Sequence, residues 1–395
     1  MRIFIQPCEV LLFRTGHPFN AGENHYADTL FPPTPETLQG AIRATIATYW
    51  NPDKTLAEVF QEPELVALIG DQEHYGRFSI TSITVGRRLK DAHPTSPVER
   101  LFPIPAHFLA EENSERQLVR LLPRPHEPAI SSNLPAPLQL LYPDKTVQSK
   151  LEPLRGWLTE KTLQKALRGQ EEIARSEIID PATIYVYELR QGIGINKQSK
   201  TTAEGRFYQA RMLHMNHRSD DPFIYGFVVD VRLQQNTPQH LEPGARKVTP
   251  LPFISDEQTQ HLFRLPDQGW MILGGERRAA RFEVISPSQS IEEQPEQRQE
   301  GNLLYLATPA AFTRGWQPRS WPNGTPIAVA MERYQPIGGW QLAPDSNGGK
   351  SKTLRRCVPA GSIYFFTAPI RRIQPFTDYG SQIGYGITFL GVYQP

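Results

Sequence analysis

Residues 30–50 read LFPPTPETLQGAIRATIATYW and contain the strongest local fold signal in the chain. Thr34 suits a helix N-cap, Pro35 suits the first helical position, and Glu36 favours the positive end of the helix dipole. An apolar stripe at helical spacing follows in Leu38, Ala41, Ile42, Ile46 and Tyr49. The sequence therefore predicts a helix that begins at Pro35 and packs one face against a core.

Strand signals lie on both sides of this helix. Residues 3–13 are apolar nearly throughout, which predicts a strand buried on both faces, and residues 14–19 form a loop before the helix. Downstream strands are predicted at 78–85, 101–109, 184–189, 207–215, 223–231, 282–285, 303–307, 363–367 and 387–393. Residues 150–178 differ, because Leu154, Trp157, Leu158, Leu163, Ala166 and Leu167 show helical spacing. These patterns predict an α+β chain with an N-terminal domain at 1–149, a helical connector or insertion at 150–180 and a C-terminal domain at 181–395.

The composition excludes several classes of protein. The two cysteines, Cys8 and Cys357, are too few and too far apart for a disulfide framework or a thiolate metal site. No apolar run approaches the ~20 residues that span a bilayer, so we expect a cytoplasmic protein without membrane contact. The formal net charge is only +1, from 42 basic and 41 acidic residues. A polyanionic partner must therefore be met by local patches.

Three segments carry such local positive charge. Residues 190–218 contain Arg190, Lys197, Lys200, Arg206, Arg211 and Arg218 against the single acid Glu204, together with Phe207 and Tyr208. Residues 350–372 contain six basic residues and no acid, and residues 274–278 read GGERR. Lys and Arg neutralise phosphates, and aromatic rings stack on unpaired bases. Any one segment could equally be a solvated loop, but the three together favour a phosphate-rich partner.

Two further features leave alternatives open. Gly384-Tyr385-Gly386 could place main-chain N–H groups near phosphates with Tyr385 stacked on a base, or could form a turn of positive φ with Tyr385 in the core. His17 and His25 flank a loop and could contact RNA or act as acid and base on it. His214 and His217 are three residues apart without a carboxylate pattern. We therefore predict no metal site, no cofactor and no assembled catalytic site.

The segments taken together resemble one family, the third subunit of the type III-B (Cmr) CRISPR effector module in the RAMP superfamily. The similarity is carried by residues 11–19 with Ala21, Gly22 and His25, and by residues 30–43, 192–195, 204–208, 273–278, 359–364 and 384–386. Members often carry Asp and Arg around the loop that here reads Thr15-Gly16-His17. That departure leaves the role of His17 open.

The resemblance implies two ferredoxin-like (RRM-like, RAMP) domains with helical and loop insertions. It also implies a non-catalytic subunit that grips the 5′ tag of a guide (CRISPR) RNA, beside the large polymerase-like subunit and a neighbouring RAMP backbone subunit, while a different subunit cuts the target. The expected RNA-binding residues are Arg14, His17, His25, Arg43, Lys197, Lys200, Arg206, Tyr208, Arg211, Arg277, Arg278, Gly384, Tyr385 and Gly386. The alternatives are a metal-independent endoribonuclease that processes repeat RNA, and a general single-strand RNA chaperone.

Overall fold

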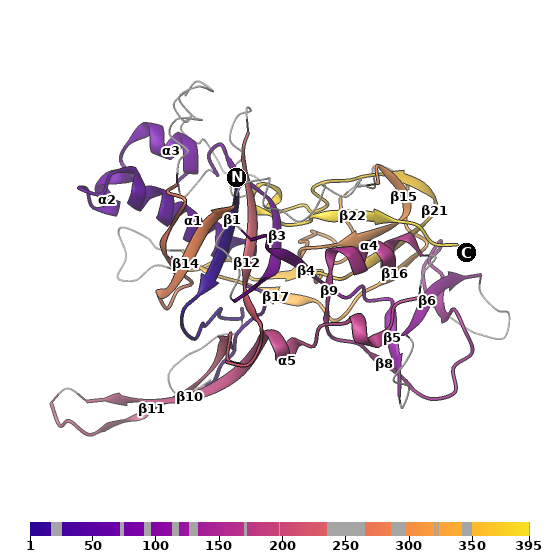
Figure 1. The fold of residues 1–395 in the computed structure, drawn as a ribbon, viewed down its shortest axis with the longest axis horizontal. Helices are drawn as coiled ribbons and strands as arrows, with labels where there is room; N and C mark the ends of the chain where they lie inside the picture. Colours follow the sequence, from indigo (N-terminus) through magenta and orange to yellow (C-terminus); the bar gives the residue numbers. More distant parts are fainter. Residues whose placement is uncertain are drawn as a thin grey trace.

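We describe the chain from a computed structural model. It describes residues 1–16, 26–71, 75–90, 96–112, 118–125, 133–169, 172–196, 198–234, 265–285, 298–319, 321, 324–341 and 350–394. One lobe carries α1, α2 and α3 with the N-terminal strand, and the other carries α4 with the C-terminal strands (Figure 1). A long hairpin of β10 and β11 projects away from both lobes (Figure 1). The chain is a strand-rich α+β protein with several antiparallel sheets.

A seven-stranded antiparallel sheet forms the first lobe, in the order β13-β14-β1-β12-β3-β4-β9. The strands are β1 Arg2–Pro7, β3 Phe78–Leu89, β4 Glu99–Pro103, β9 Trp157–Thr159, β12 Phe223–Leu233, β13 Gln268–Leu273 and β14 Arg278–Ile285. The apolar start of the chain is buried on both faces as predicted, since Ile3, Phe4 and Ile5 are at most 1% exposed. β1 ends at Pro7, and the rest of the predicted strand continues only as an isolated bridge from Leu11 to Leu213.

Helix α1 (Pro35–Trp50) confirms the local prediction. The Thr34 side chain caps it by accepting a hydrogen bond from the Thr37 N–H at 3.3 Å, and Leu38 and Ile42 pack in the same core as Phe227 of the sheet. The short helices α2 (Leu56–Val59) and α3 (Pro63–Ile69) follow it. None of the described helices is both long enough and apolar enough to cross a membrane.

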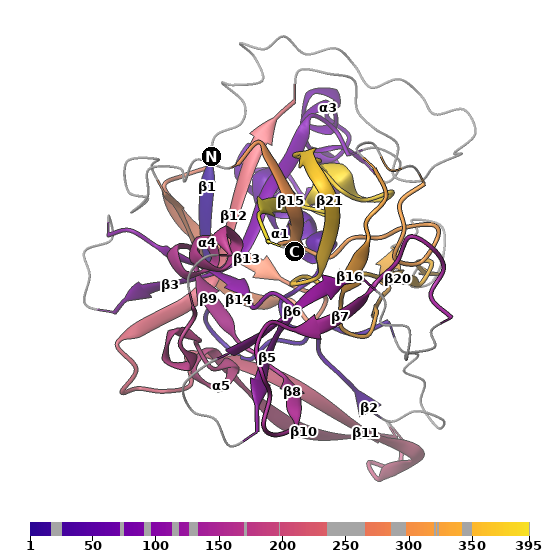
Figure 2. The ribbon, with the colours of Figure 1, turned by 90° about the vertical axis from the view of Figure 1, so that its right-hand side faces the viewer.

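The second lobe combines two four-stranded sheets and helix α4 (Glu160–Arg168). One sheet has the order β16-β21-β15-β22, with strands β15 Glu300–Leu306, β16 Ala328–Ala330, β21 Ile363–Arg371 and β22 Thr388–Gly391. The other has the order β7-β6-β5-β8, with strands β5 Phe108–Glu111, β6 Leu118–Arg124, β7 Leu140–Pro143 and β8 Leu151–Pro153. Figure 2 shows this second sheet below β15 and β21. The predicted strand at 101–109 is divided between β4 and β5.

Two small antiparallel pairs complete the described strands of this lobe. β17 (Gln335–Ile337) pairs with β20 (Arg355–Cys357), and β18 (Trp340–Gln341) pairs with β19 (Lys350–Ser351). A 3-10 turn, η3 (Ser381–Ile383), precedes β22 and leads into Gly384. β17 and β20 become important below, because they lie beside the N-terminal loop.

The predicted helical connector is only partly helical. Trp157 and Leu158 lie in β9 rather than in a helix, because they pair with Pro103 and Phe102 of β4. The helix begins at Glu160, where the Thr159 side chain accepts a hydrogen bond from Thr162 N–H at 3.2 Å. Its buried residues Leu163, Ala166 and Leu167 keep the predicted spacing, and the short turn η1 (Arg175–Glu177) follows. Sheet pairing has therefore overridden the helical pattern at the start of this segment.

The predicted domain boundaries do not coincide with the boundaries of the sheets. β1, β3 and β4 come from residues 1–149, whereas β12, β13 and β14 come from residues 181–395. All six strands belong to the same sheet. The predicted domain boundaries at 149/150 and 180/181 therefore stay a prediction. The strands pair across them.

A buried ion pair attaches α4 to the seven-stranded sheet. Arg100 of β4 donates from Nε to Oε2 of Glu160 at 2.8 Å and from Nη2 to Oε1. Their side chains are only 9% and 2% exposed. Asp230 of β12 lies 3.9 Å from Arg100 and accepts from Arg2 of β1 at 2.7 Å. One connected set of charges thus joins α4, β4, β12 and β1.

Candidate RNA interface

The projecting hairpin consists of β10 (Tyr185–Ile195) and β11 (Thr202–Met215), and α5 (Pro181–Ile184) leads into it. The predicted strands at 184–189 and 207–215 are confirmed, and both continue further towards the turn. Beside β11 lies the short parallel strand β2 (Tyr26–Ala27). The hairpin therefore presents most of its length as a two-stranded ribbon (Figure 1).

One face of the ribbon carries solvent-exposed apolar side chains. Leu189, Ile193, Ile195 and Phe207 are between 42% and 58% exposed. Ile193 lies opposite Phe207 across the strand pair, so these side chains share a face. Contiguous exposed apolar surface of this kind is typical of an interaction site.

Tyr208 lies on the opposite face and explains the nearby glycine. Gly192 is its cross-strand partner, and a Cβ at Gly192 would come within 2.2 Å of the Tyr208 ring. The ring therefore lies across the Gly192 backbone while its residue remains 45% exposed. A side chain at this position would therefore displace the Tyr208 ring.

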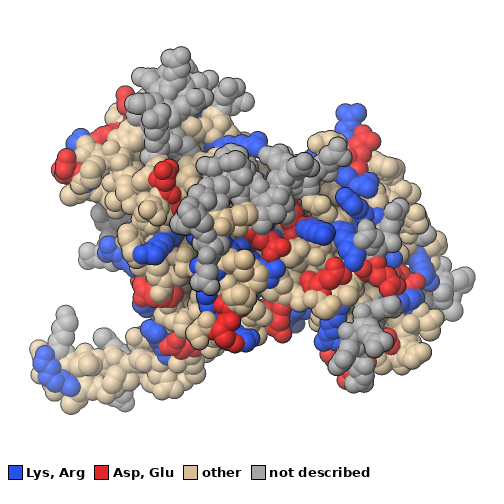
Figure 3. All heavy atoms as spheres, viewed as in Figure 1, with Lys and Arg blue, Asp and Glu red and all other residues tan. Residues whose placement is uncertain are grey.

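The far end of the hairpin carries an exposed lysine. Lys200 lies in the turn with φ of 58° and is exposed, and Figure 3 shows a basic side chain at this end while both signs are mixed over the rest of that face. Lys197 and the side chain of Arg206 lie outside the described residues. Near the base of the hairpin, Arg211 pairs with Asp28 at 2.7 Å and lies 4.2 Å from the Tyr187 ring centre. Arg211 is thus held in place by the protein.

The turn between β13 and β14 holds two adjacent arginines in different settings. Arg277 has φ of 55° and an exposed side chain. Arg278 donates to Glu9 at 3.0 Å, and Glu9 also accepts from the Ala279 N–H at 2.9 Å. These hydrogen bonds, first that of Ala279 and then that of Arg278, lower the pKa of the Glu9 carboxyl. Arg277 is therefore the better placed of the two to meet a phosphate.

Replacing Arg277 by Ala should lower the slope of log K against log salt by about 0.7, the amount expected for one phosphate contact with single-stranded RNA. Filter binding over a salt series measures this slope. Arg278→Ala should change it less, because Arg278 is already neutralised by Glu9. Equal slopes for Arg277→Ala and the unmodified chain would remove Arg277 from the interface.

The N-terminal loop and helix α1 contribute the next predicted residues. Arg14 is exposed, and its backbone bridges to Thr29. His17 and His25 lie outside the described residues. Arg43 of α1 donates from Nη2 to the carbonyl oxygens of Gly70 at 2.8 Å and Asp71 at 3.2 Å, and burial lowers its pKa to about 10. Arg43 therefore holds the end of α3, and RNA contact would compete with these bonds.

Gly384, Tyr385 and Gly386 are buried, which favours the core interpretation of this segment over the stacking one. Gly384 and Gly386 have φ of 97° and 67°. Tyr385 is 1% exposed, and its hydroxyl bonds to the Glu36 carboxylate at the start of α1. Burial raises the Tyr385 pKa well above its usual range, with a further rise from Glu36. Stacking on a base would require a different conformation of this segment.

The Arg14–Gly16 loop and the segment Gly384–Gly386 approach the same small strand. A Cβ at Gly16 would lie 3.1 Å from the Gly338 N and 3.3 Å from the Pro336 O, at β17. Ile337 of β17 shares a buried cluster with Tyr385. The Arg14–Gly16 loop and the closing glycine segment therefore both lie near β17, and Gly384 and Gly386 are buried.

Comparison with protein families gives one match that covers residues 3–393, to the family described as CRISPR-associated protein (Cas_Cmr3). The chain belongs to this family. The match spans every segment discussed above and confirms the resemblance drawn from the sequence. A comparison with curated proteins found no match.

Two solved structures are similar to this chain at low identity. One is described as "Cryo-EM structure of the Type III-B Cmr-beta bound to cognate target RNA and AMPPnP, state 1", with 18% identity, a TM-score of 0.43, and coverage of 92% of this chain and 86% of that chain. The other is described as "Cryo-EM structure of the Type III-B Cmr-beta bound to cognate target RNA", with 16% identity, a TM-score of 0.44 and the same coverage.

Sequence patterns alone missed the apolar face of the hairpin. Leu189, Ile193 and Ile195 occur at every second or fourth position, which ordinarily indicates a strand with one buried face. The sequence did contain one signal: basic residues surround these apolar ones, which is unusual for a strand packed on a core. The structure explains the pattern, because the hairpin projects away from the body of the protein and its apolar side chains stay exposed.

Proposed function

We propose that this chain is a non-catalytic RNA-binding subunit of a type III-B CRISPR effector ribonucleoprotein. In this role it anchors the 5′ tag of the guide RNA, contacts the large polymerase-like subunit and a neighbouring RAMP backbone subunit, and uses two ferredoxin-like units as its framework. Membership of the Cas_Cmr3 family supports the proposal. The observation that carries the RNA-binding part is the projecting hairpin, which combines the exposed Lys200 at its end with exposed Phe207 and Tyr208.

The hairpin suits a flexible polyanion for physical reasons. A narrow ribbon gives two solvent-facing sides, so bases can stack on one side while phosphates meet cations at the end. Phe207 and Tyr208 lie on opposite sides of this ribbon, next to each other in sequence. We infer that both sides of the hairpin are covered when RNA and the neighbouring subunit are bound.

Phe207→Ala and Tyr208→Ala should each weaken binding of tagged guide RNA by about 5–150-fold, since stacking contributes ~1–3 kcal/mol per base. Tyr208→Phe should bind normally, because the ring is kept. Fluorescence anisotropy with labelled guide RNA, with and without its 5′ tag, measures these affinities in EDTA.

A matched control is Leu56→Ala on α2, which removes an apolar side chain of similar exposure at 45% and should leave binding unchanged. Unaltered affinity in both alanine variants would contradict the role of the hairpin. The same samples on a denaturing gel test the absence of catalysis. Site-specific RNA cutting that is lost in His17→Ala or His25→Ala would instead support the endoribonuclease.

A further inference from the structure

A cavity of about 570 Å³ lies where the two lobes meet. It is lined by residues 31–35 at the start of α1, by residues of β3, β4 and β9 of the seven-stranded sheet, and by residues 307–309, 331–337 and 359–361 of the second lobe. Its volume falls within the ~300–1,000 Å³ typical of small-molecule and cofactor sites. The cavity is thus large enough for a group the size of a nucleotide.

The walls of the cavity are flat, apolar and fixed. Phe31 packs against Trp157 with ring centres 5.7 Å apart and against Tyr185 at 4.2 Å. Trp157 is 6% exposed, so its position is set by the core. Pro32 and Pro309 line the neighbouring walls and have no N–H groups to offer. Such walls favour a planar aromatic ligand over a strongly hydrated one.

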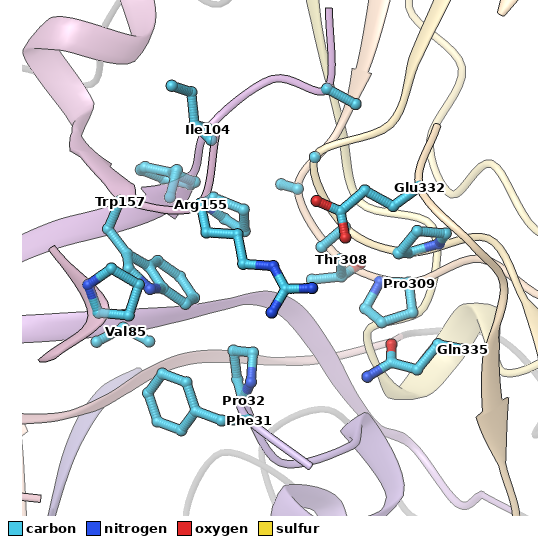
Figure 4. Close-up of a pocket in the computed structure, with 18 of the residues that line it drawn as sticks. Phe31, Pro32, Val85, Ile104, Arg155, Trp157, Thr308, Pro309, Glu332 and Gln335 are labelled. Carbon is cyan, nitrogen blue, oxygen red and sulfur yellow. The ribbon is translucent and has the colours of Figure 1, made fainter. Parts of the chain in front are cut away.

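The polar groups of the cavity come from two distant segments: Arg155 lies between β8 and β9, and Glu332 lies between β16 and β17. Figure 4 shows the Arg155 guanidinium and the Glu332 carboxylate both directed into the cavity, with the Gln335 amide on the same side as Glu332. Arg155 and Glu332 are exposed residues, and neither forms a hydrogen bond or an ion pair with any residue that the structure describes. The cavity therefore offers donors from one side and acceptors from the other.

The cavity also adjoins cations suited to an RNA backbone. β17 lines it with Gln335, and β17 pairs with the strand that carries Arg355 and Arg356. Arg356 lies 5.2 Å from the ring centre of Tyr334, another lining residue. The loop that follows the exposed Arg14 packs against β17 at Pro336 and against the adjacent Gly338. A phosphate chain that follows these cations would bring its bases to the mouth of the cavity.

We propose that this cavity receives one unpaired base of the bound RNA, with guanine preferred; the proposal rests on the RNA-binding function proposed above. Single-stranded RNA is recognised by bases that leave the stack, pack on aromatic rings and bond through their edges. Guanine alone presents two adjacent N–H donors, which suit the Glu332 carboxylate, while its O6 and N7 accept from a guanidinium such as that of Arg155. Phe31, Trp157 and the prolines hold the plane of the base.

The test uses the full chain and oligonucleotides of eight nucleotides, all uridine except for one central G, A, C or inosine. The ratio of affinities for the G and all-uridine oligonucleotides is the readout. It should be about 5–150 in the unmodified chain, the range for one good bidentate pair. Inosine, which lacks the N2 amino group, should bind less tightly than G. Arg155→Ala and Glu332→Gln should each bring the ratio close to one.

The matched control is Lys150→Ala, which removes an exposed cation outside the cavity and should leave the ratio unchanged. A ratio near one in the unmodified chain, or a ratio that survives both cavity substitutions, overturns the proposal while the RNA-binding function stands. Failure of the unmodified chain to bind any oligonucleotide or tagged guide RNA would instead overturn the proposed function. Loss of copurification with another subunit in Arg155→Ala, with the ratio intact, would assign the cavity to a protein partner.

Discussion

Replacing Arg100 by Met should lower the free energy of unfolding by about 3–5 kcal/mol, because removal of one member of a buried ion pair leaves the other without compensation. Glu160 is 2% exposed in its side chain and takes two hydrogen bonds from the Arg100 guanidinium. Met fills most of the volume of the lost side chain, so the effect reports the charge rather than a cavity. Urea denaturation followed by circular dichroism measures the change.

The control for this experiment is Arg218→Met. Arg218 pairs with Asp220 at 2.9 Å, but the two side chains are 50% and 70% exposed. Exposed pairs contribute ~0–1 kcal/mol, so this variant should be nearly neutral. The double variant Arg100→Met/Glu160→Leu should recover much of the loss, since no charge remains buried. Equal effects of Arg100→Met and Arg218→Met would show that the pair does not hold α4 to the sheet.

Gly386→Ala should lower the free energy of unfolding by roughly 3 kcal/mol or more. Its φ of 67° disfavours any side chain by ~1–2 kcal/mol, and the added Cβ would lie 2.3 Å from the Phe376 carbonyl oxygen. That contact is with backbone, so the neighbouring segment must move. Phe376 N–H also donates to the Gly386 carbonyl at 2.7 Å. The expected loss is therefore one of folding, with RNA binding impaired only as a consequence.

Gly40→Ala on α1 is the matched control, since a Cβ there meets nothing within 4 Å. Alanine in a helix interior should stabilise by ~0.5–1 kcal/mol relative to glycine. Thermal melting and anisotropy on the same samples separate folding from binding. If Gly386→Ala melts normally and still loses affinity for the tagged RNA, the segment contacts RNA directly and the core interpretation fails.

Local signals predicted the local structure well. α1 was predictable because its cap, its proline and its apolar stripe all lie within one short segment. Trp157 and Leu158 were predicted in a helix, because their pairing with β4 depends on residues more than fifty positions earlier. Strand order and the mixing of both halves in one sheet depend on such distant pairs, and no local pattern contains them.

The candidate site likewise combines features that a local sequence pattern predicts with features that depend on distant contacts. Residue type and clustering drew attention to the β10–β11 segment, whose contact with RNA stays a prediction. They could not distinguish the exposed Tyr208 from the buried Tyr385. Arg278 and Arg211 look like free cations in the sequence, and each pairs with an acid from the first thirty residues. Arg155 and Glu332 lie in segments without a sequence motif, and only the tertiary fold brings both to one cavity.

β1 lies inside the seven-stranded sheet, so it can pair with its neighbours only after most of the chain has been synthesised. Its two neighbours, β12 and β14, lie more than two hundred residues later in the chain. At ~5–20 residues per second, the first of these neighbours, β12, leaves the ribosome roughly 10–45 s after β1. During that interval Ile3, Phe4 and Ile5 have no strand to pair with, and unpaired apolar strands aggregate readily. We therefore expect the nascent chain to aggregate less when a chaperone shields its first strand until the sheet can close.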